Sequence, residues 1–314
     1  MRGTGGYYTT MVGSRRNPWA PLALLGVAIL WGTTFAAVKT GLADSSPLLF
    51  LGARFVIASV AALPFLRRGR GTRAALRAGL PLGIVYALGF AAQTIGLTTT
   101  SPSRSAFLTG LNVAIVPLWA ALVLGRKPRP LSVLGLVVAL PGMWLLTAPA
   151  AGGWTAGDSW TVACAVLFAL HVVLVGRVGD RFHAGGLLVS QLVVTSGLAL
   201  GGAPLLEEPH FRLSAPLVVA LLVTALLGTV ATTWLQLRFQ PAIDPTRAGL
   251  IFATEPVFAS FFAWLVFRET LPPTAWLGGA IILAGMALSE VGSAGAADPA
   301  GAPLAAAPRT ESRP

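Results

Sequence analysis

Ten hydrophobic stretches of membrane-spanning length dominate this sequence. They lie at residues 19–38, 47–66, 78–97, 104–124, 131–148, 159–178, 185–206, 215–236, 247–267 and 274–290. A bilayer core about 30 Å thick requires about 20 apolar residues per helix. Charged residues make up only 11% of the chain, against about a quarter in soluble proteins. The sequence therefore predicts an all-α membrane protein with ten transmembrane helices and no soluble catalytic domain between them.

The last five stretches repeat the first five. A shift of 143 residues aligns 102–145 with 245–288 without a gap, and the matches include prolines, arginines and glycines: Pro102 and Pro245, Arg104 and Arg247, Pro130 and Pro273, Gly135 and Gly278, Gly142 and Gly285. Because five is an odd number, the second half must enter the membrane from the opposite side. We therefore predict two inverted five-helix repeats, at residues 19–148 and 149–291.

Both ends of the chain differ from the hydrophobic body. Residues 1–18 are rich in Gly, Thr and Arg, and residues 292–314 are rich in Ala, Pro and Gly, which predicts disorder in each segment. Seventeen of the 22 Lys and Arg residues fall on the side of the predicted membrane that carries the two ends. The positive-inside rule then predicts a cell-membrane protein with cytoplasmic termini. Anionic lipids, and not nucleic acid, are the expected partners of this charge.

Glycine spacing predicts close helix contacts. Gly135 and Gly142, like Gly278 and Gly285, are seven residues apart and lie on one helix face, where small residues let helices approach. GxxxG pairs occur at residues 79–83 and 197–201. Such pairs pack helices within one chain or form the seam of a homodimer.

Several short motifs carry a family resemblance. The first half contains Leu30-Trp31-Gly32-Thr33-Thr34-Phe35, a closing Lys39 and Ala53-Arg54-Phe55, while the second contains residues 245–251, Glu255-Pro256-Val257-Phe258 and Phe267-Arg268-Glu269. Over roughly residues 19–290 the chain resembles EamA-type members of the drug/metabolite transporter superfamily. The resemblance implies ten helices, cytoplasmic termini and movement of small metabolites or drugs, more often outward. Arg126 departs from the family pattern, which usually has an acidic residue there.

Two ionisable residues fall near the middle of predicted spans. Arg54 and Glu255 are each eight or nine residues into an apolar stretch, where a charge costs about 2.5 to 3.5 kcal/mol. One explanation is that they neutralise each other or other buried dipoles as a structural lock. The other is that Glu255 takes up a proton during a transport cycle.

Prolines next to these polar positions predict interrupted helices. Pro256 follows Glu255, Pro117 lies five residues after Asn112, and the shift of 143 places Asn112 opposite Glu255. Interrupted helices at corresponding places in two repeats indicate a transport site. The alternative is that both prolines only curve their helices.

Uncharged polar and aromatic residues in the spans complete the set of substrate-binding or coupling candidates, which comprises Trp31, Thr34, Arg54, Gln93, Asn112, His171, Gln191, Trp234, Gln236 and Glu255. Ordinary structural roles compete with this interpretation. A threonine in a helix often bonds its own backbone, an aromatic residue often packs in a core, and a lone histidine is more often hydrogen-bonded than a proton relay.

The sequence contains no nucleotide-binding loop, no spacing of metal ligands and thus no sign of a cofactor. We predict a secondary transporter, not an enzyme, that exports a small amphipathic metabolite such as an amino acid or a drug-like compound by alternating access, with protons as a candidate coupling ion. A flippase for a lipid-linked sugar is an alternative. A membrane-embedded enzyme is another, and the outer cluster Glu207, Glu208 and His210 is the feature it would use.

Overall fold

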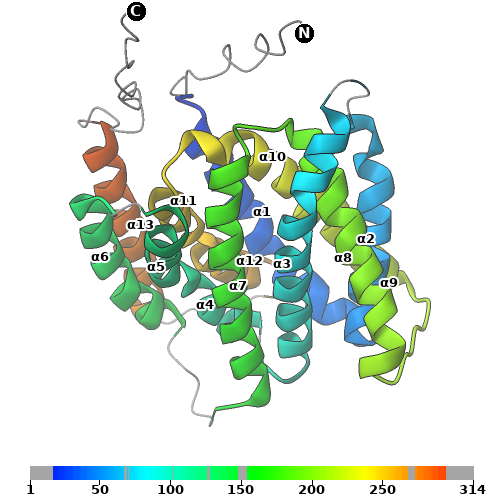
Figure 1. Ribbon diagram of the computed structural model, residues 1–314. Helices are drawn as coiled ribbons and strands as arrows, with labels where there is room; N and C mark the ends of the chain where they lie inside the picture. Colours follow the sequence, from blue (N-terminus) through cyan, green and yellow to red (C-terminus); the bar gives the residue numbers. More distant parts are fainter. Residues whose placement is uncertain are drawn as a thin grey trace, which may run out of the picture.

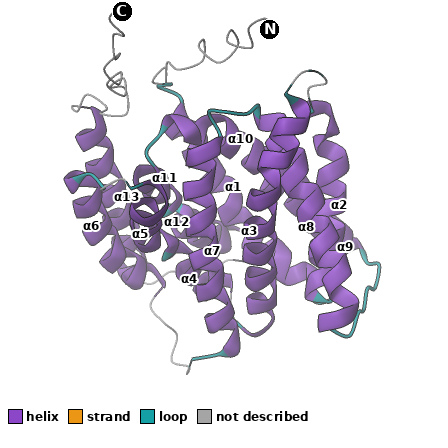
Figure 2. Cartoon of the chain, in the orientation of Figure 1, coloured by secondary structure: helices purple, strands orange, loops and turns teal. Residues whose placement is uncertain are grey.

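The computed structural model describes residues 17–66, 69, 71–100, 102–125, 128–147, 154–267 and 273–294. These residues form a bundle of helices that run approximately parallel to one another (Figures 1 and 2). The chain is a multi-pass membrane protein, as predicted. The predicted disordered segments, residues 1–18 and 292–314, lie almost entirely outside the described residues.

The helices follow the ten predicted spans. The first half contains α1 (Ala20–Gly41), α2 (Pro47–Ala62) with a 3-10 turn at Leu63–Phe65, α3 (Thr72–Thr99), α4 (Pro102–Gly110), α5 (Asn112–Leu124) and α6 (Pro130–Thr147). The second half contains α7 (Ala156–Val178), α8 (Ala184–Leu206), α9 (Ala215–Ala225), α10 (Thr232–Phe239), α11 (Pro245–Phe252), α12 (Glu255–Phe267) and α13 (Pro273–Ala294). Over the described ranges, seven helical segments are long and apolar enough to cross a membrane.

Three spans are built from two helices each. They are α4 with α5, α9 with α10, and α11 with α12. A π-helical turn at Leu226–Ala231 joins α9 to α10, and a 3-10 turn at Gln240–Ala242 follows α10. These irregular turns and breaks lie inside the bundle, where side chains and neighbouring helices can satisfy the freed backbone groups.

The helix breaks agree with the repeat but not with one of the prolines. Leu111 separates α4 from α5, and Ala253 and Thr254 separate α11 from α12. The shift of 143 places Leu111 on Thr254, so the two breaks are equivalent. Pro256 lies one residue inside α12, where a missing N–H costs nothing. Pro117 lies inside α5, which continues through it, and the break precedes Asn112, so the break and the proline do not coincide in the first repeat.

The equivalence of the two repeats is seen most clearly where α6 crosses α13. A Cβ atom added to Gly142 would lie 2.8 Å from the carbonyl oxygen of Gly278, and one added to Gly285 would lie 2.6 Å from that of Gly135. The same two glycine positions of each repeat therefore contact each other reciprocally, as a two-fold axis between α6 and α13 requires. This contact confirms the predicted close packing.

The other glycine pairs behave differently from each other. Gly79 and Gly83 on α3 face α8, where added Cβ atoms would meet Ser190 and Val194. This pair packs helices within the chain. At Gly197 and Gly201, apart from the chain neighbours and the nearby backbone of α8 itself, no atom of the described residues lies within 4 Å of the position that an added Cβ would take.

The bundle has two distinct ends. Helix α1 begins and helix α13 ends at the top of Figure 1, which we call the termini side. The opposite end, which we call the far side, contains the end of α1, the start of α2, the end of α3 and the start of α7. Polar contacts join the helices on the far side and are described below with the central cavity.

Candidate functional site

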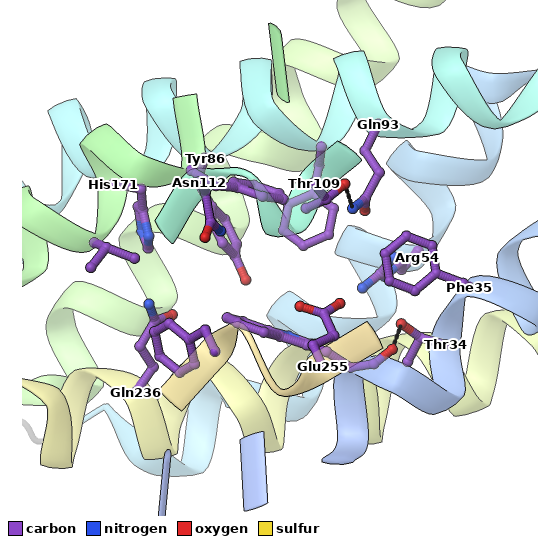
Figure 3. A pocket seen from close by; sticks show the side chains of 15 residues that line it. Thr34, Phe35, Arg54, Tyr86, Gln93, Thr109, Asn112, His171, Gln236 and Glu255 are labelled. Carbon is purple, nitrogen blue, oxygen red and sulfur yellow. Dashed lines mark hydrogen bonds between the residues drawn. The ribbon is translucent and has the colours of Figure 1, made fainter. Parts of the chain in front are cut away.

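A small cavity lies at the centre of the bundle, between helices of the two repeats (Figure 3). The centre of a water-sized sphere can occupy about 30 Å³ of it, more than the roughly 10 to 15 Å³ that a single bound water requires. Its lining comes from α1, α2, α3, α4, α5, α7, α10, α11 and α12, and consists of Trp31, Thr34, Phe35, Arg54, Tyr86, Phe90, Gln93, Thr109, Asn112, Phe168, His171, Val172, Gln236, Phe252 and Glu255. Eight of the ten predicted site residues therefore converge on one space.

Arg54 is held by dipoles and aromatic rings. Its Nε donates to the Thr229 hydroxyl at 2.8 Å and its Nη2 to the Gly228 carbonyl at 3.3 Å. The guanidinium also lies 4.8 Å from the ring centre of Phe90 and 5.5 Å from that of Phe55, a favourable cation–π geometry. The sequence left two kinds of partner for Arg54, the carboxylate of Glu255 or buried dipoles. Among the described residues Arg54 forms no ion pair, and its partners are the dipoles of Thr229 and Gly228.

The π-helical turn explains why these acceptors are available. Gly228 and Thr229 both lie within Leu226–Ala231, where the regular hydrogen-bond ladder is disturbed. The Gly228 carbonyl accepts from Thr232 and from Arg54. The absence of a side chain on Gly228 also lets Thr34 of α1 approach closely. The π-helical turn thus provides hydrogen-bond acceptors for the buried guanidinium of Arg54.

Asn112 and Glu255 occupy equivalent positions in the two repeats. Asn112 is the first residue of α5 and Glu255 is the first residue of α12, and both side chains line the cavity. The carboxylate of Glu255 extends toward the middle of the cavity, opposite Asn112 and Thr109 (Figure 3). A carboxylate in the first turn of a helix interacts favourably with the helix dipole.

Aromatic rings form much of the remaining wall. Tyr86 and Phe90 lie edge to face at 4.6 Å, Phe90 contacts Phe168 at 5.0 Å, and Trp31 contacts Phe252 at 5.1 Å. The Thr34 hydroxyl donates to the Trp31 carbonyl at 2.8 Å. Thr34 therefore follows the structural interpretation for threonines, in which the side chain bonds its own helix.

Two glutamines that the repeat makes equivalent lie on opposite sides of the cavity. Gln93 donates from Nε2 to the Thr109 hydroxyl at 3.4 Å, toward the far side. Gln236 donates from Nε2 to Gln240 Oε1 at 2.9 Å, toward the termini side. Gln240 in turn donates to the Val172 carbonyl at 2.6 Å. Each glutamine thus links the cavity to the helices that close one end.

His171 forms a hydrogen bond with Gln191, a predicted site residue that does not line the cavity. His171 Nε2 and Gln191 Oε1 are 2.6 Å apart, and Gln191 Nε2 donates to the Leu187 carbonyl at 3.2 Å. This second bond assigns Gln191 Oε1 as an acceptor, so Nε2 of His171 carries a proton. The imidazole also stacks on Tyr86 at 4.7 Å, and Tyr86 shares a 2.7 Å hydrogen bond with Thr233.

Trp234 lies away from the cavity. Its ring packs against Phe65 at 5.6 Å and against Phe239 at 6.5 Å, near the termini side. Seven lining residues were not among the ten candidates, and Phe35 and Val172 are two of them. Position in the repeat was a signal for both, because a shift of 137 residues places Trp31, Thr34 and Phe35 on Phe168, His171 and Val172.

Charged groups join four helices between the cavity and the far side. Lys39 at the end of α1 donates from Nζ to the carbonyls of Leu97 and Thr100 at the end of α3, at 2.5 and 3.2 Å. Asp158 of α7 accepts from Arg104 Nε at 2.9 Å and from the Thr100 hydroxyl at 2.8 Å. These contacts join α1, α3, α4 and α7 immediately beyond Gln93 and Phe35.

Glu207, one member of the outer cluster considered for an enzyme, has a structural role. Glu207 accepts hydrogen bonds from the Ser46 hydroxyl at 2.6 Å and from the Leu48 and Leu49 amides at 2.9 and 3.1 Å. Its carboxylate therefore satisfies the free N–H groups at the start of α2.

Comparison with known proteins agrees with this architecture. The model of the EamA-like transporter family matches residues 18–148 and 155–290. An uncharacterized transporter of Archaeoglobus fulgidus is 29% identical over 265 residues, covering 84% of this chain and 83% of that protein. The uncharacterized inner membrane transporter YedA of Escherichia coli K12 is 26% identical over 288 residues, covering 86% of this chain and 90% of YedA.

A solved crystal structure shares the fold. It superposes with a TM-score of 0.72 at 18% sequence identity and covers 88% of this chain and 97% of the other. The two matched segments of the family model together span most of the chain and coincide with the two halves that meet at the cavity. The protein is therefore a membrane transporter, not an enzyme, and belongs to the EamA-like transporter family.

Proposed function

We propose that the protein exports a small amphipathic metabolite or drug-like compound by alternating access. The observation that carries this proposal is the central cavity, which both repeats line and in which Asn112 and Glu255 begin equivalent half-helices. Inverted-repeat transporters bind substrate at such a place. Aromatic walls beside a few polar groups suit a compound with both apolar and polar parts.

The contacts around the cavity support a cycle with two gates. Lys39 and the Arg104–Asp158 pair close the far side, and the Gln236–Gln240–Val172 chain closes the termini side. The space of about 30 Å³ that is open to the centre of a water-sized sphere is too small for a metabolite. Substrate entry therefore requires the helices at one of these gates to separate.

We further propose that protons drive export through Glu255. Its side chain is buried, at 7% exposure, yet faces the cavity and not the lipid. Intramembrane carboxylates in such positions commonly carry protons. Arg54, by contrast, is bonded to Thr229 and Gly228 and would keep its charge as a structural element.

The test is transport by purified protein in liposomes of fixed internal pH, with a pooled set of amino acids and amphipathic drugs. Saturable uptake that an imposed proton gradient accelerates supports the proposal. Glu255→Gln should insert normally but lose the dependence on pH, while Glu208→Gln, at an exposed far-side position, should behave as the parent. Unchanged pH dependence in Glu255→Gln removes this residue from coupling.

The flippase alternative receives less support. Such a protein would need a lateral opening lined with basic residues for a lipid-linked sugar. The lateral cavity between α1, α12 and α13 has a volume of about 510 Å³ and is lined by apolar side chains with one serine: Ile29, Val257, Phe258, Ser260, Phe261, Phe262, Trp276, Gly279, Ala280 and Leu283. None of these described residues is basic.

A further inference from the structure

The central cavity contains buried polar atoms that no protein group satisfies. Over the described ranges, six buried side-chain nitrogen or oxygen atoms lack a hydrogen-bond partner, and three of them belong to the cavity lining: Trp31 Nε1, Asn112 Oδ1 and Gln236 Oε1. Leaving a buried polar atom without a partner costs about 1 to 3 kcal/mol. Three such atoms around one space indicate that a ligand supplies the missing bonds.

The hydrogen bonds around Gln236 determine which atom of its side-chain amide remains without a partner. Gln240 Nε2 donates to the Val172 carbonyl, so Gln240 presents its Oε1 to Gln236. Gln236 must then use its Nε2 as the donor to Gln240, as the 2.9 Å contact shows. The remaining amide atom of Gln236 is Oε1, an acceptor. The linked hydrogen bonds of the two glutamines thus assign the oxygen and nitrogen of the Gln236 amide, which atomic positions alone do not distinguish.

Glu255 adds two further acceptors and a negative charge. Its carboxylate extends into the cavity (Figure 3), and within the described part of the chain it makes neither an ion pair nor a side-chain hydrogen bond. Arg54, the other ionisable lining residue apart from His171 and Tyr86, directs Nε and Nη2 at Thr229 and Gly228. Hydrogen bonds to the turn between α9 and α10 therefore stabilise the charge of Arg54. No such bond stabilises the charge of Glu255 among the described residues.

The unmatched groups are unequal in kind. Among the fully buried lining atoms without a partner, Asn112 Oδ1 and Gln236 Oε1 are acceptors and Trp31 Nε1 is a donor, and Glu255 adds two carboxylate oxygens. A primary ammonium group has three donors and no acceptor, and it complements this set. A carboxylate would require several donors and would lie beside Glu255, so the same set disfavours it.

The walls specify the rest of the ligand. Tyr86, Phe90 and Phe168 form one edge-to-face group, and Trp31 with Phe252 forms a second. Flat or branched apolar groups pack well between such rings, and a cation gains from their faces.

We infer that the substrate is a primary amine carried on an aromatic or branched apolar group, without a carboxylate. The ammonium binds between Glu255, Asn112 and Gln236, and Trp31 Nε1 accommodates one acceptor such as a hydroxyl. This inference rests on the transport function proposed above and names the chemical class that the cavity selects.

Binding to the full-length protein in detergent tests the inference, with four probes that differ by one group each. They are 2-phenylethylamine, its N,N,N-trimethyl derivative, 3-phenylpropionate and L-phenylalanine. Titration calorimetry should show 2-phenylethylamine binding at least about tenfold more tightly than the other three, because each either loses N–H donors or gains a carboxylate. Equal or tighter binding of L-phenylalanine or of the trimethyl derivative overturns the inference.

Variants locate the ammonium. Asn112→Ala and Gln236→Ala should each weaken 2-phenylethylamine binding about five- to tenfold, and Glu255→Gln should remove its advantage over 3-phenylpropionate. Thr195→Val is the matched control, since Thr195 Oγ1 is also buried without a partner but lies outside the cavity lining. Equal losses in Thr195→Val and Asn112→Ala would contradict the assignment, and melting temperatures report whether each variant folds.

The liposome assay separates failure of this inference from failure of the transport function. If none of the four probes binds while another pooled compound shows saturable uptake, the inference is wrong and the transport function stands. If no compound is transported and none binds, both fall.

Discussion

At the scale of single residues, Arg54 is the most tightly constrained side chain. It is 1% exposed, its nitrogens bond Thr229 and Gly228, and its guanidinium faces two phenylalanine rings. A planar guanidinium can make all these contacts at once, whereas a lysine ammonium is a compact charge on a flexible stem. The residue therefore ties α2 to the π-helical turn through geometry as well as through charge.

We expect Arg54→Lys to lower the free energy of unfolding by about 2 kcal/mol, because a hydrogen bond to a charged group contributes about 1.5 to 3 kcal/mol. The apparent melting temperature in detergent measures the effect. Arg177→Lys, at an exposed position of α7, is the matched control and should melt like the parent. An unchanged melting temperature for Arg54→Lys would show that the guanidinium geometry is dispensable.

At the scale of helices, the crossing of α6 and α13 joins the two repeats. Gly142 lies against the Gly278 carbonyl, and Gly285 lies against the Gly135 carbonyl and Ala139. In a membrane, helices associate through close packing, since lipid provides no hydrophobic driving force between them. Side chains at these glycines would force the helix axes apart.

Gly142→Val and Gly285→Val should therefore each destabilise the protein by about 1 to 3 kcal/mol, the usual cost of overpacking. Thermal unfolding followed by loss of helical circular dichroism is the measurement. Gly197→Ala serves for comparison, because apart from the chain neighbours and the nearby backbone of α8 no described atom lies within 4 Å of the added Cβ and alanine favours the helix. Destabilisation by Gly197→Ala as large as that by Gly142→Val would argue against the crossing as its cause.

At the scale of the whole molecule, two sets of polar contacts bracket the cavity. The far-side set joins four helices through Lys39, Thr100, Arg104 and Asp158. Asp158 is fully buried there, so removing its charge leaves Arg104 and Thr100 with a weaker acceptor. Alternating access requires these contacts to break when the far side opens.

Asp158→Asn should raise the population that is open on the far side, by about tenfold for each 1.4 kcal/mol lost. A reporter cysteine at Phe35, which lines the cavity, placed in a Cys164→Ala background, should then react faster with an impermeant maleimide added on the far side of the membrane. Glu208→Gln in the same reporter is the control. Equal reaction rates with and without Asp158→Asn would exclude this contact as a gate.

Much of the fold could be predicted because its signals are local. Apolar runs of span length and glycine spacings each lie within one stretch of sequence, and the repeat emerges when two such stretches are compared. The structure confirms the ten spans and the α6–α13 contact. The equivalence of Asn112 and Glu255 also followed from the repeat. The position of the helix break in the first repeat did not follow from the sequence, because Pro117 lies within α5 and the chain turns at Leu111.

Only the tertiary structure decided which face of each helix meets the cavity. In a membrane the lipid-facing and buried sides of a helix are both apolar, so hydropathy could not separate Trp234, which packs away from the cavity, from Phe35, which lines it. The partners of Arg54 are 174 and 175 residues away along the chain. The sequence alone thus determined how the chain crosses the membrane and repeats, while helix rotation and packing decided which polar atoms are satisfied and which remain for a substrate.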